Sequence, residues 1–108
     1  MSVKIESQED MLIAYLEGEL DHHAAAPIRQ QIDDALLQQK PKKLIIDFGD
    51  LSFMDSSGIG LVMGRYKTAS EVGATLTVQN ISSQVYKVMR LSGIDRIAVI
   101  KMKNQARG

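Results

Sequence analysis

The sequence of 108 residues contains no cysteine and no tryptophan, and only 5% of its residues are aromatic. The lack of cysteine excludes disulfides, thiolate catalysis and cysteine-based zinc sites. Thirteen basic residues balance thirteen acidic ones, which argues against binding to nucleic acid through bulk positive charge. No apolar run approaches the roughly 20 residues of a membrane helix, and residues 1–6 lack the apolar core of a signal peptide. We therefore expect a cytoplasmic protein without a nucleic-acid or membrane partner.

What the chain does contain is a hydrophobic content of 44%, enough for one compact domain over residues 1–108. Apolar alternation and one continuous apolar run predict strands at 3–7, 11–16, 44–46, 74–79 and 96–101. Helical spacing predicts helices at 24–38 and 58–72 and a short helix that begins after Ser82 or Ser83. Helices that alternate with strands predict an α/β fold with a largely parallel or mixed sheet.

The spacing of apolar residues also predicts which helix faces are buried. In the helix at 24–38 the predicted core residues are Ile28, Ile32, Ala35 and Leu36, in the helix at 58–72 they are Ile59, Val62, Met63 and Tyr66, and in the short third helix they are Val85, Val88, Met89 and Leu91. Residues 49–57 are predicted to form a loop, and residues 104–108 to be frayed.

The stretch Asp55-Ser56-Ser57-Gly58-Ile59-Gly60 lies where a buried strand is followed by a helix. Backbone N–H groups at a helix start point outward and the helix dipole favours negative charge, so a serine there could carry a phosphate. An ordinary turn, capped by serine or aspartate, explains the same residues. Spacing alone favours the capping turn.

Three glycines, Gly58, Gly60 and Gly64, leave the first turns of this helix without side chains, although an interior glycine costs a helix roughly 1 kcal/mol. Bare backbone is useful where another protein must come close. Tight packing against the protein's own sheet explains the glycines equally well.

The adjacent histidines His22 and His23 are a poor pair of metal ligands because neighbouring side chains point in different directions, so we predict no metal site. A Ser-His-Asp hydrolase could be assembled from Ser56, either histidine and Asp21. No glycine-serine-glycine elbow and no second oxyanion motif accompany these residues, and little chain remains for a substrate pocket, so a hydrolase is disfavoured.

Residues 51–60, followed by Gly64-Arg65-Tyr66-Lys67, resemble the STAS-domain anti-sigma factor antagonists. The stretch Gly18-Glu19-Leu20-Asp21-His22-His23-Ala24 makes the resemblance stronger to the sporulation stage II antagonists of endospore-forming bacteria. The resemblance extends from about Ile5 to Ile97. It implies a single STAS domain with a four- to five-stranded mixed sheet flanked by helices. Relatives usually continue into a C-terminal helix, which we expect here to be short or absent.

The resemblance implies a non-enzymatic switch without a cofactor. The unphosphorylated antagonist binds a GHKL-type anti-sigma factor and releases the sigma factor. The anti-sigma factor, which is also a serine kinase, phosphorylates the first serine after the aspartate, here Ser56, and a PP2C-type phosphatase restores the protein. Spacing alone allows either serine. The residues implied to bind the partner are Asp21, His22, Asp55, Ser56, Ser57, Gly58, Gly60 and Arg65. The alternative is a STAS module that serves as a scaffold or small-ligand sensor.

Overall fold

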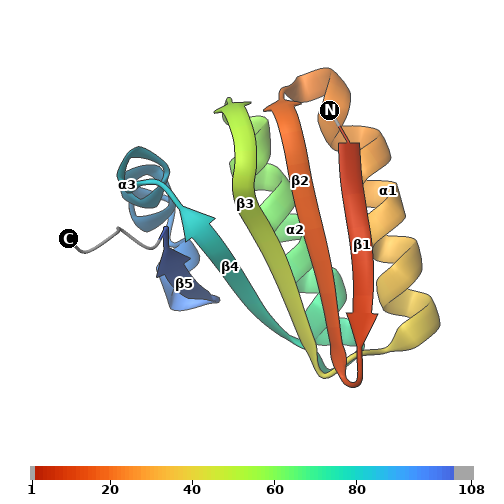
Figure 1. Cartoon of the computed structure of the whole chain (residues 1–108). Coiled ribbons are helices and arrows are strands. Elements are labelled where there is room, and N and C mark those ends of the chain that lie inside the picture. The colour runs from red at the N-terminus through yellow and green to blue at the C-terminus, as the bar shows by residue number, and fades with distance from the viewer. Residues whose placement is uncertain (1, 104–108) are drawn as a thin grey trace.

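The computed structural model describes residues 2–103, which form a five-stranded mixed sheet with two long helices against one face (Figure 1). In chain order the elements are β1 (Ser2–Gln8), β2 (Met11–Leu20), α1 (His22–Gln39), β3 (Lys43–Met54), α2 (Ser57–Glu71), β4 (Thr75–Ile81), α3 (Ser83–Leu91), the 3₁₀ turn η1 (Ile94–Arg96) and β5 (Val99–Met102). The spatial order of the strands follows the chain, with β1 antiparallel to β2 and the other pairs parallel. The predicted α/β fold is confirmed.

The core lies between the sheet and helices α1 and α2. Alternate residues of the strands point into it, because successive side chains of a strand face opposite sides of the sheet. Strands β2, β3 and β4 contribute Leu12, Leu16, Leu20, Leu44, Ile46, Leu76 and Val78, and the two helices contribute Ile28, Ile32, Leu36, Leu61, Val62 and Ala69. Each fully buried large aliphatic side chain contributes about 1.5–3 kcal/mol. This layer therefore holds both helix starts rigidly against the sheet.

Strand β3 is much longer than the predicted strand at 44–46, and most of the predicted loop at 49–57 is wrong. Its pairing with β4 ends at Asp47↔Gln79, but its pairing with β2 continues to Leu20↔Met54. The pair Gly49-Asp50 is typical of a turn, but here it is part of a strand because β3 pairs with β2. Sequence periodicity does not report such pairing between distant segments. As a result, residue 55 directly follows a strand rather than a loop.

Strand β2 is also longer than predicted and ends beside β3. Gly18 has a φ of 95° at a register shift between the two strands, a left-handed conformation that favours glycine. The N–H of Asp55 donates to the carbonyl oxygen of Leu20 at 3.2 Å, one residue beyond the last strand pair. The two strands therefore finish side by side at the same edge of the sheet (Figure 1).

The predicted buried faces of the second and third helices are confirmed only in part: Val62 and Met89 are fully buried and Ile59, Tyr66 and Val85 pack against the core, whereas Met63, Val88 and Leu91 are exposed. In α2 the buried residues are Gly58, Leu61, Val62, Arg65 and Ala69, and Met63 is 38% exposed. In α3 only Met89 is buried. Because short amphipathic segments satisfy more than one apolar spacing, these faces are decided by tertiary packing rather than by the pattern alone.

At the C-terminal side of the fold, η1 occupies residues 94–96, so β5 begins at Val99 rather than at the predicted Arg96. Its strand ladder with β4 is short, and Lys103 is the last described residue. The prediction of fraying at 104–108 lies outside the described residues. No helix within residues 2–103 combines the length and the apolar character needed to span a membrane.

Candidate functional site

Two helix starts lie next to each other at the edge where β2 and β3 end. Asp21 follows β2 and begins α1, while Asp55 and Ser56 follow β3 and begin α2. Because β2 and β3 are parallel and end in register at Leu20↔Met54, these segments emerge at the same edge (Figure 1). The structure therefore brings together Asp21, His22 and the serine stretch, which the resemblance implies as partner contacts.

The start of α1 is closed by Asp21. Its backbone is extended, its carboxylate Oδ1 accepts a hydrogen bond from the N–H of Ala24 at 2.9 Å, and its carbonyl oxygen accepts from Ala25 at 3.1 Å. The Ala24 hydrogen bond is the main cause of a lowered pKa at Asp21. Asp21 is therefore the N-cap of α1, which begins at His22 rather than at the predicted residue 24.

The start of α2 is closed differently. Ser56 already has helical backbone angles, φ −62° and ψ −17°, and its side chain makes no capping hydrogen bond. Asp55 caps instead: its Oδ1 accepts from the N–H of Ser57 at 2.8 Å and its carbonyl oxygen accepts from Gly58 at 3.0 Å. The capping explanation therefore accounts for Asp55 but leaves the exposed Ser56 hydroxyl without that role.

The N–H groups of this helix start are less available than the sequence suggested. Ser57 and Gly58 donate to Asp55, and Ile59 donates to the carbonyl oxygen of Ser56 at 3.1 Å. A phosphate on Ser56 would have to share these donors. The helix dipole still favours negative charge there, but the expectation of outward-pointing free N–H groups needs this correction.

The glycines of α2 serve two different purposes. Gly58 is buried, and a Cβ atom on it would lie 2.3 Å from Cγ and Sδ of Met54 and 3.3 Å from Leu20. A Cβ on Gly60 or Gly64 would have no neighbour within 4 Å. Packing against the protein's own sheet thus explains Gly58, whereas Gly60 and Gly64 leave backbone open to another molecule.

Arg65 is not part of the exposed surface, so its prediction as a direct partner contact is corrected. Its side chain is 5% exposed, and Nε lies 2.8 Å from Oδ1 of Asp33, whose side chain is 24% exposed. The N–H does not point at the carboxylate oxygen, so this is an ion pair without an aligned hydrogen bond. Burial lowers the pKa of Arg65 and Asp33 opposes that shift. The pair links α2 to α1.

The histidines lie at the surface of the first turn of α1. The His22 and His23 rings meet edge to face with centroids 5.8 Å apart. Residues 2–103 contain no cluster of three or more side chains of the metal-binding types. The side-chain hydrogen bond found at the Asp21 carboxylate comes from the N–H of Ala24, and none joins Asp21 to a histidine ring among residues 2–103, as a catalytic triad would require.

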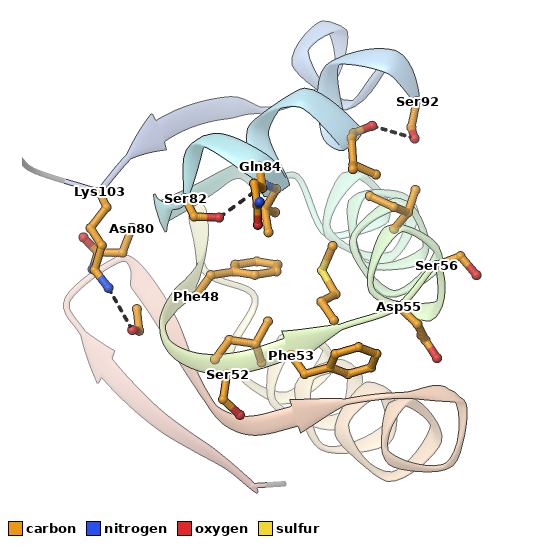
Figure 2. Close-up of a pocket in the computed structure, with 16 residues that line it drawn as sticks. Phe48, Ser52, Phe53, Asp55, Ser56, Asn80, Ser82, Gln84, Ser92 and Lys103 are labelled. Atoms are coloured by element: carbon orange, nitrogen blue, oxygen red, sulfur yellow. Dashed lines mark hydrogen bonds between the residues drawn. The ribbon is translucent and has the colours of Figure 1, made fainter.

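A groove of about 750 Å³, which sequence reasoning missed, opens beside Ser56. It runs between the last part of β3, the start of α2 and helix α3 (Figure 2). Phe48, Phe53, Met54, Ile59, Val85 and Val88 supply apolar side chains to its lining. Two of its lining residues, Phe53 and Val88, are 51% and 44% exposed, and no pattern in the sequence reports this exposure.

One family of domains matches nearly the whole chain. The family model described as "STAS domain" matches residues 2–106, and the chain belongs to this family. The sequence resemblance to its anti-sigma factor antagonists is confirmed by the relatives.

Among the relatives is an anti-sigma F factor antagonist of Paenibacillus polymyxa, 33% identical over 93% of this chain and 86% of its own length. The anti-sigma factor antagonist SpoIIAA in its unphosphorylated form superposes with a TM-score of 0.75 at 33% identity, over 96% of this chain and 90% of that one. The Bacillus cell fate determinant SpoIIAA in its phosphorylated form gives 0.74 at 36% identity, over 92% and 90%.

Proposed function

We propose that this protein is an anti-sigma factor antagonist whose state is controlled by phosphorylation of Ser56. Without phosphate it binds an anti-sigma factor that is also a serine kinase, and the bound sigma factor is released. Phosphorylation of Ser56 by that kinase ends the complex, and a PP2C-type phosphatase restores it. The protein acts as one STAS domain in the cytoplasm, performs no catalysis itself and regulates sporulation transcription.

The observation that carries this proposal is the Ser56 hydroxyl. It is exposed, it makes no capping hydrogen bond, and it lies at the rim of an apolar groove. A kinase can reach such a hydroxyl without opening the fold, because Asp55 already closes the helix start. The relatives described above, one of which has a phosphorylated form, support the same assignment.

A phosphate at this position changes the charge of the surface more than its shape. It adds about −1.5 to −2 charges at neutral pH, next to the carboxylate of Asp55 and at the same edge as Asp21. The fold tolerates this charge, because it stays in water and near the positive end of the helix dipole. An interface fitted to a neutral hydroxyl does not, because the charge would lose its water on binding.

Asp21, His22, Ser57 and Gly60 complete the proposed contact surface. The first two lie at the start of α1, and Gly60 leaves the α2 backbone accessible. Gly58 contributes indirectly, since it lets α2 pack close to Met54. Arg65 holds the two helices together and is left out of the surface.

The experiment that tests the proposal is phosphorylation by the cognate anti-sigma factor with ATP, followed by mapping with mass spectrometry. We expect one phosphate, on Ser56, and no phosphorylation of the Ser56→Ala variant. Wild-type protein that binds the kinase but gains no phosphate on Ser56 would contradict the assignment. Equal modification of Ser56 and Ser57 would contradict the choice of serine.

A scaffold or ligand-sensor role within the STAS family is the second candidate, and the groove beside Ser56 is the observation that favours it. A sensor of this kind would bind a small molecule and would not need a kinase. Failure of the kinase experiment together with saturable binding of a small molecule in the groove would favour this role.

A further inference from the structure

We propose that the groove between β3, α2 and α3 is a docking site for an apolar segment of the anti-sigma factor. This inference rests on the proposed function and extends its contact surface from the two helix starts to α3. The segment presents bulky aliphatic or aromatic side chains to the middle of the groove, an acidic group at one end and a hydrogen-bond donor or cation at the other.

The middle of the groove supplies the apolar contact. Phe53 from β3 and Val88 from α3 line it and remain 51% and 44% exposed. Figure 2 shows Phe48 in the space below α3 and Phe53 further along β3, toward Asp55. Large apolar side chains that gather in one concave place, rather than singly, mark a surface that another molecule covers.

The groove exists because β3 separates from β4 at Asp47. This carboxylate is 7% exposed and accepts hydrogen bonds from the side chains of Gln79 and Asn80, at 2.7 and 2.8 Å, and from the N–H of Gly49 at 2.8 Å. The β3–β4 ladder ends at Asp47↔Gln79, and Asn80 takes a left-handed φ of 58°. The network fixes the point of separation, so the groove is built into the fold rather than opened by a mobile loop.

The two ends of the groove carry opposite charge. Among the described residues that line it, only Asp55 and Lys103 are charged. Figure 2 shows them at opposite ends, Asp55 beside Ser56 and Lys103 beside Asn80, with apolar side chains between. Lys103 Nζ lies 3.4 Å from the carbonyl oxygen of Gly49 and is otherwise exposed. A segment with an acid near Lys103 and a donor near Asp55 matches this charge pattern.

Ser56 itself lines the groove, so the docking site is continuous with the switch. A phosphate there places about two negative charges at the mouth of an apolar site. Docking of the segment would remove water from that charge, at a cost that no contact in the apolar middle offsets. Phosphorylation thereby weakens the groove contact as well as the contacts of the helix starts.

The test compares two exposed apolar residues of similar accessibility. Val88 lies in the groove and is 44% exposed, and Leu37 lies on α1, outside the groove lining, and is 55% exposed. The variants Val88→Lys and Leu37→Lys are titrated, unphosphorylated, against the purified cognate anti-sigma factor with ADP. We expect Val88→Lys to weaken binding about tenfold or more, and Leu37→Lys to change it less than about twofold. Circular dichroism and the melting temperature confirm that both variants are folded.

A second pair tests the charged end. Lys103 lines the groove, whereas Lys101, on β5, does not. We expect Lys103→Glu to weaken binding about threefold to tenfold, and Lys101→Glu to leave it within about twofold, at low ionic strength. This pair still gives an answer if Val88→Lys fails to fold.

The outcomes separate this inference from the function on which it rests. If the wild type does not bind the anti-sigma factor at all, both are overturned. If the wild type binds and is phosphorylated on Ser56 but Val88→Lys and Lys103→Glu bind like the wild type, only the groove is overturned. The groove proposal is also overturned if Leu37→Lys weakens binding of the anti-sigma factor as much as Val88→Lys does. If Val88→Lys and Lys103→Glu abolish the binding of an apolar small molecule but leave binding of the anti-sigma factor unchanged, the groove is assigned to a ligand instead.

Discussion

The starts of α1 and α2 lie side by side, yet their polar side chains are used in opposite ways. The carboxylate of Asp21 accepts a hydrogen bond from the N–H of Ala24 and caps α1. Ser56 has helical backbone angles and makes no capping hydrogen bond, and Asp55 caps α2 instead. A capping side chain is held in place by its hydrogen bond to the first turn of the helix. A side chain released from capping is free for a kinase or a partner, and this difference singles out Ser56.

The largest expected effect concerns the ion pair that holds the two helices together. Arg65→Ala leaves Asp33 without its partner, and we expect a loss of about 2 kcal/mol in the free energy of unfolding, below the 3–5 kcal/mol of a fully buried pair because Asp33 keeps contact with water. Urea unfolding measures it. Lys67→Ala, an exposed change on α2, serves as the control and should cost less than about 0.5 kcal/mol. An Arg65→Ala protein that is fully stable yet fails to bind the anti-sigma factor would restore Arg65 as a contact residue.

The next effect concerns the uncapped serine. Ser56→Asp places a negative charge at the α2 start, and we expect at least about a tenfold loss of affinity for the anti-sigma factor, with the melting temperature nearly unchanged. Ser56→Ala should bind and resist phosphorylation. Ser57→Ala, the matched neighbour, should cost less affinity than Ser56→Asp. Calorimetric titration gives these affinities, and wild-type binding by Ser56→Asp would show that charge at this site is not the switch.

Two glycines in the same turn should respond with opposite signs. Gly58→Ala pushes against Met54 and should lower stability by about 1 kcal/mol, in the range for overpacking. Gly60→Ala meets no neighbour and should raise stability by about 0.5–1 kcal/mol, because alanine favours the helix. If the missing side chain at Gly60 lets the anti-sigma factor contact the α2 backbone, the more stable Gly60→Ala protein should bind the anti-sigma factor less tightly. Stabilisation with unchanged affinity would remove Gly60 from the surface.

The smallest effect is the pH dependence of the α1 cap. The lowered pKa of Asp21 means that its charged form stabilises the fold above the ordinary carboxyl pKa of about 3.9, and that this contribution is lost as the pH falls through the lower folded-state pKa. The melting temperature of Asp21→Ala should therefore be lower than that of the wild type at pH 7, and the difference between the two melting temperatures should become smaller below about pH 4. Asp21→Asn keeps a capping oxygen and should retain most of the stability. A gap that does not change with pH would contradict the charged cap.

Much of the fold follows from local patterns in the sequence. Ile28, Ile32 and Leu36 recur at helical spacing and form the buried face of α1. The order of strands and helices was likewise readable from alternation. The extension of β3 was not, because residues 49–54 become a strand only through pairing with β2, more than 30 positions earlier in the chain.

The site was predictable in position but not in detail. Residues 55–60 mark a strand-to-helix junction in the sequence, but which residue caps depends on the backbone angles of Ser56. Arg65 interrupts the apolar face of α2, and only the placement of Asp33 on α1 explains how a cation is accommodated there. The groove depends on where β3 separates from β4, which no local pattern encodes.

The most direct measurement of the central claim is the affinity of one protein for the cognate anti-sigma factor before and after phosphorylation. The wild type is phosphorylated to completion, the site is verified by mass spectrometry, and both forms are titrated under identical salt with ADP. We predict that phosphate on Ser56 alone lowers the affinity by at least about tenfold and leaves the circular dichroism spectrum unchanged. Equal affinities of the two forms would contradict the assignment of Ser56 as the switch.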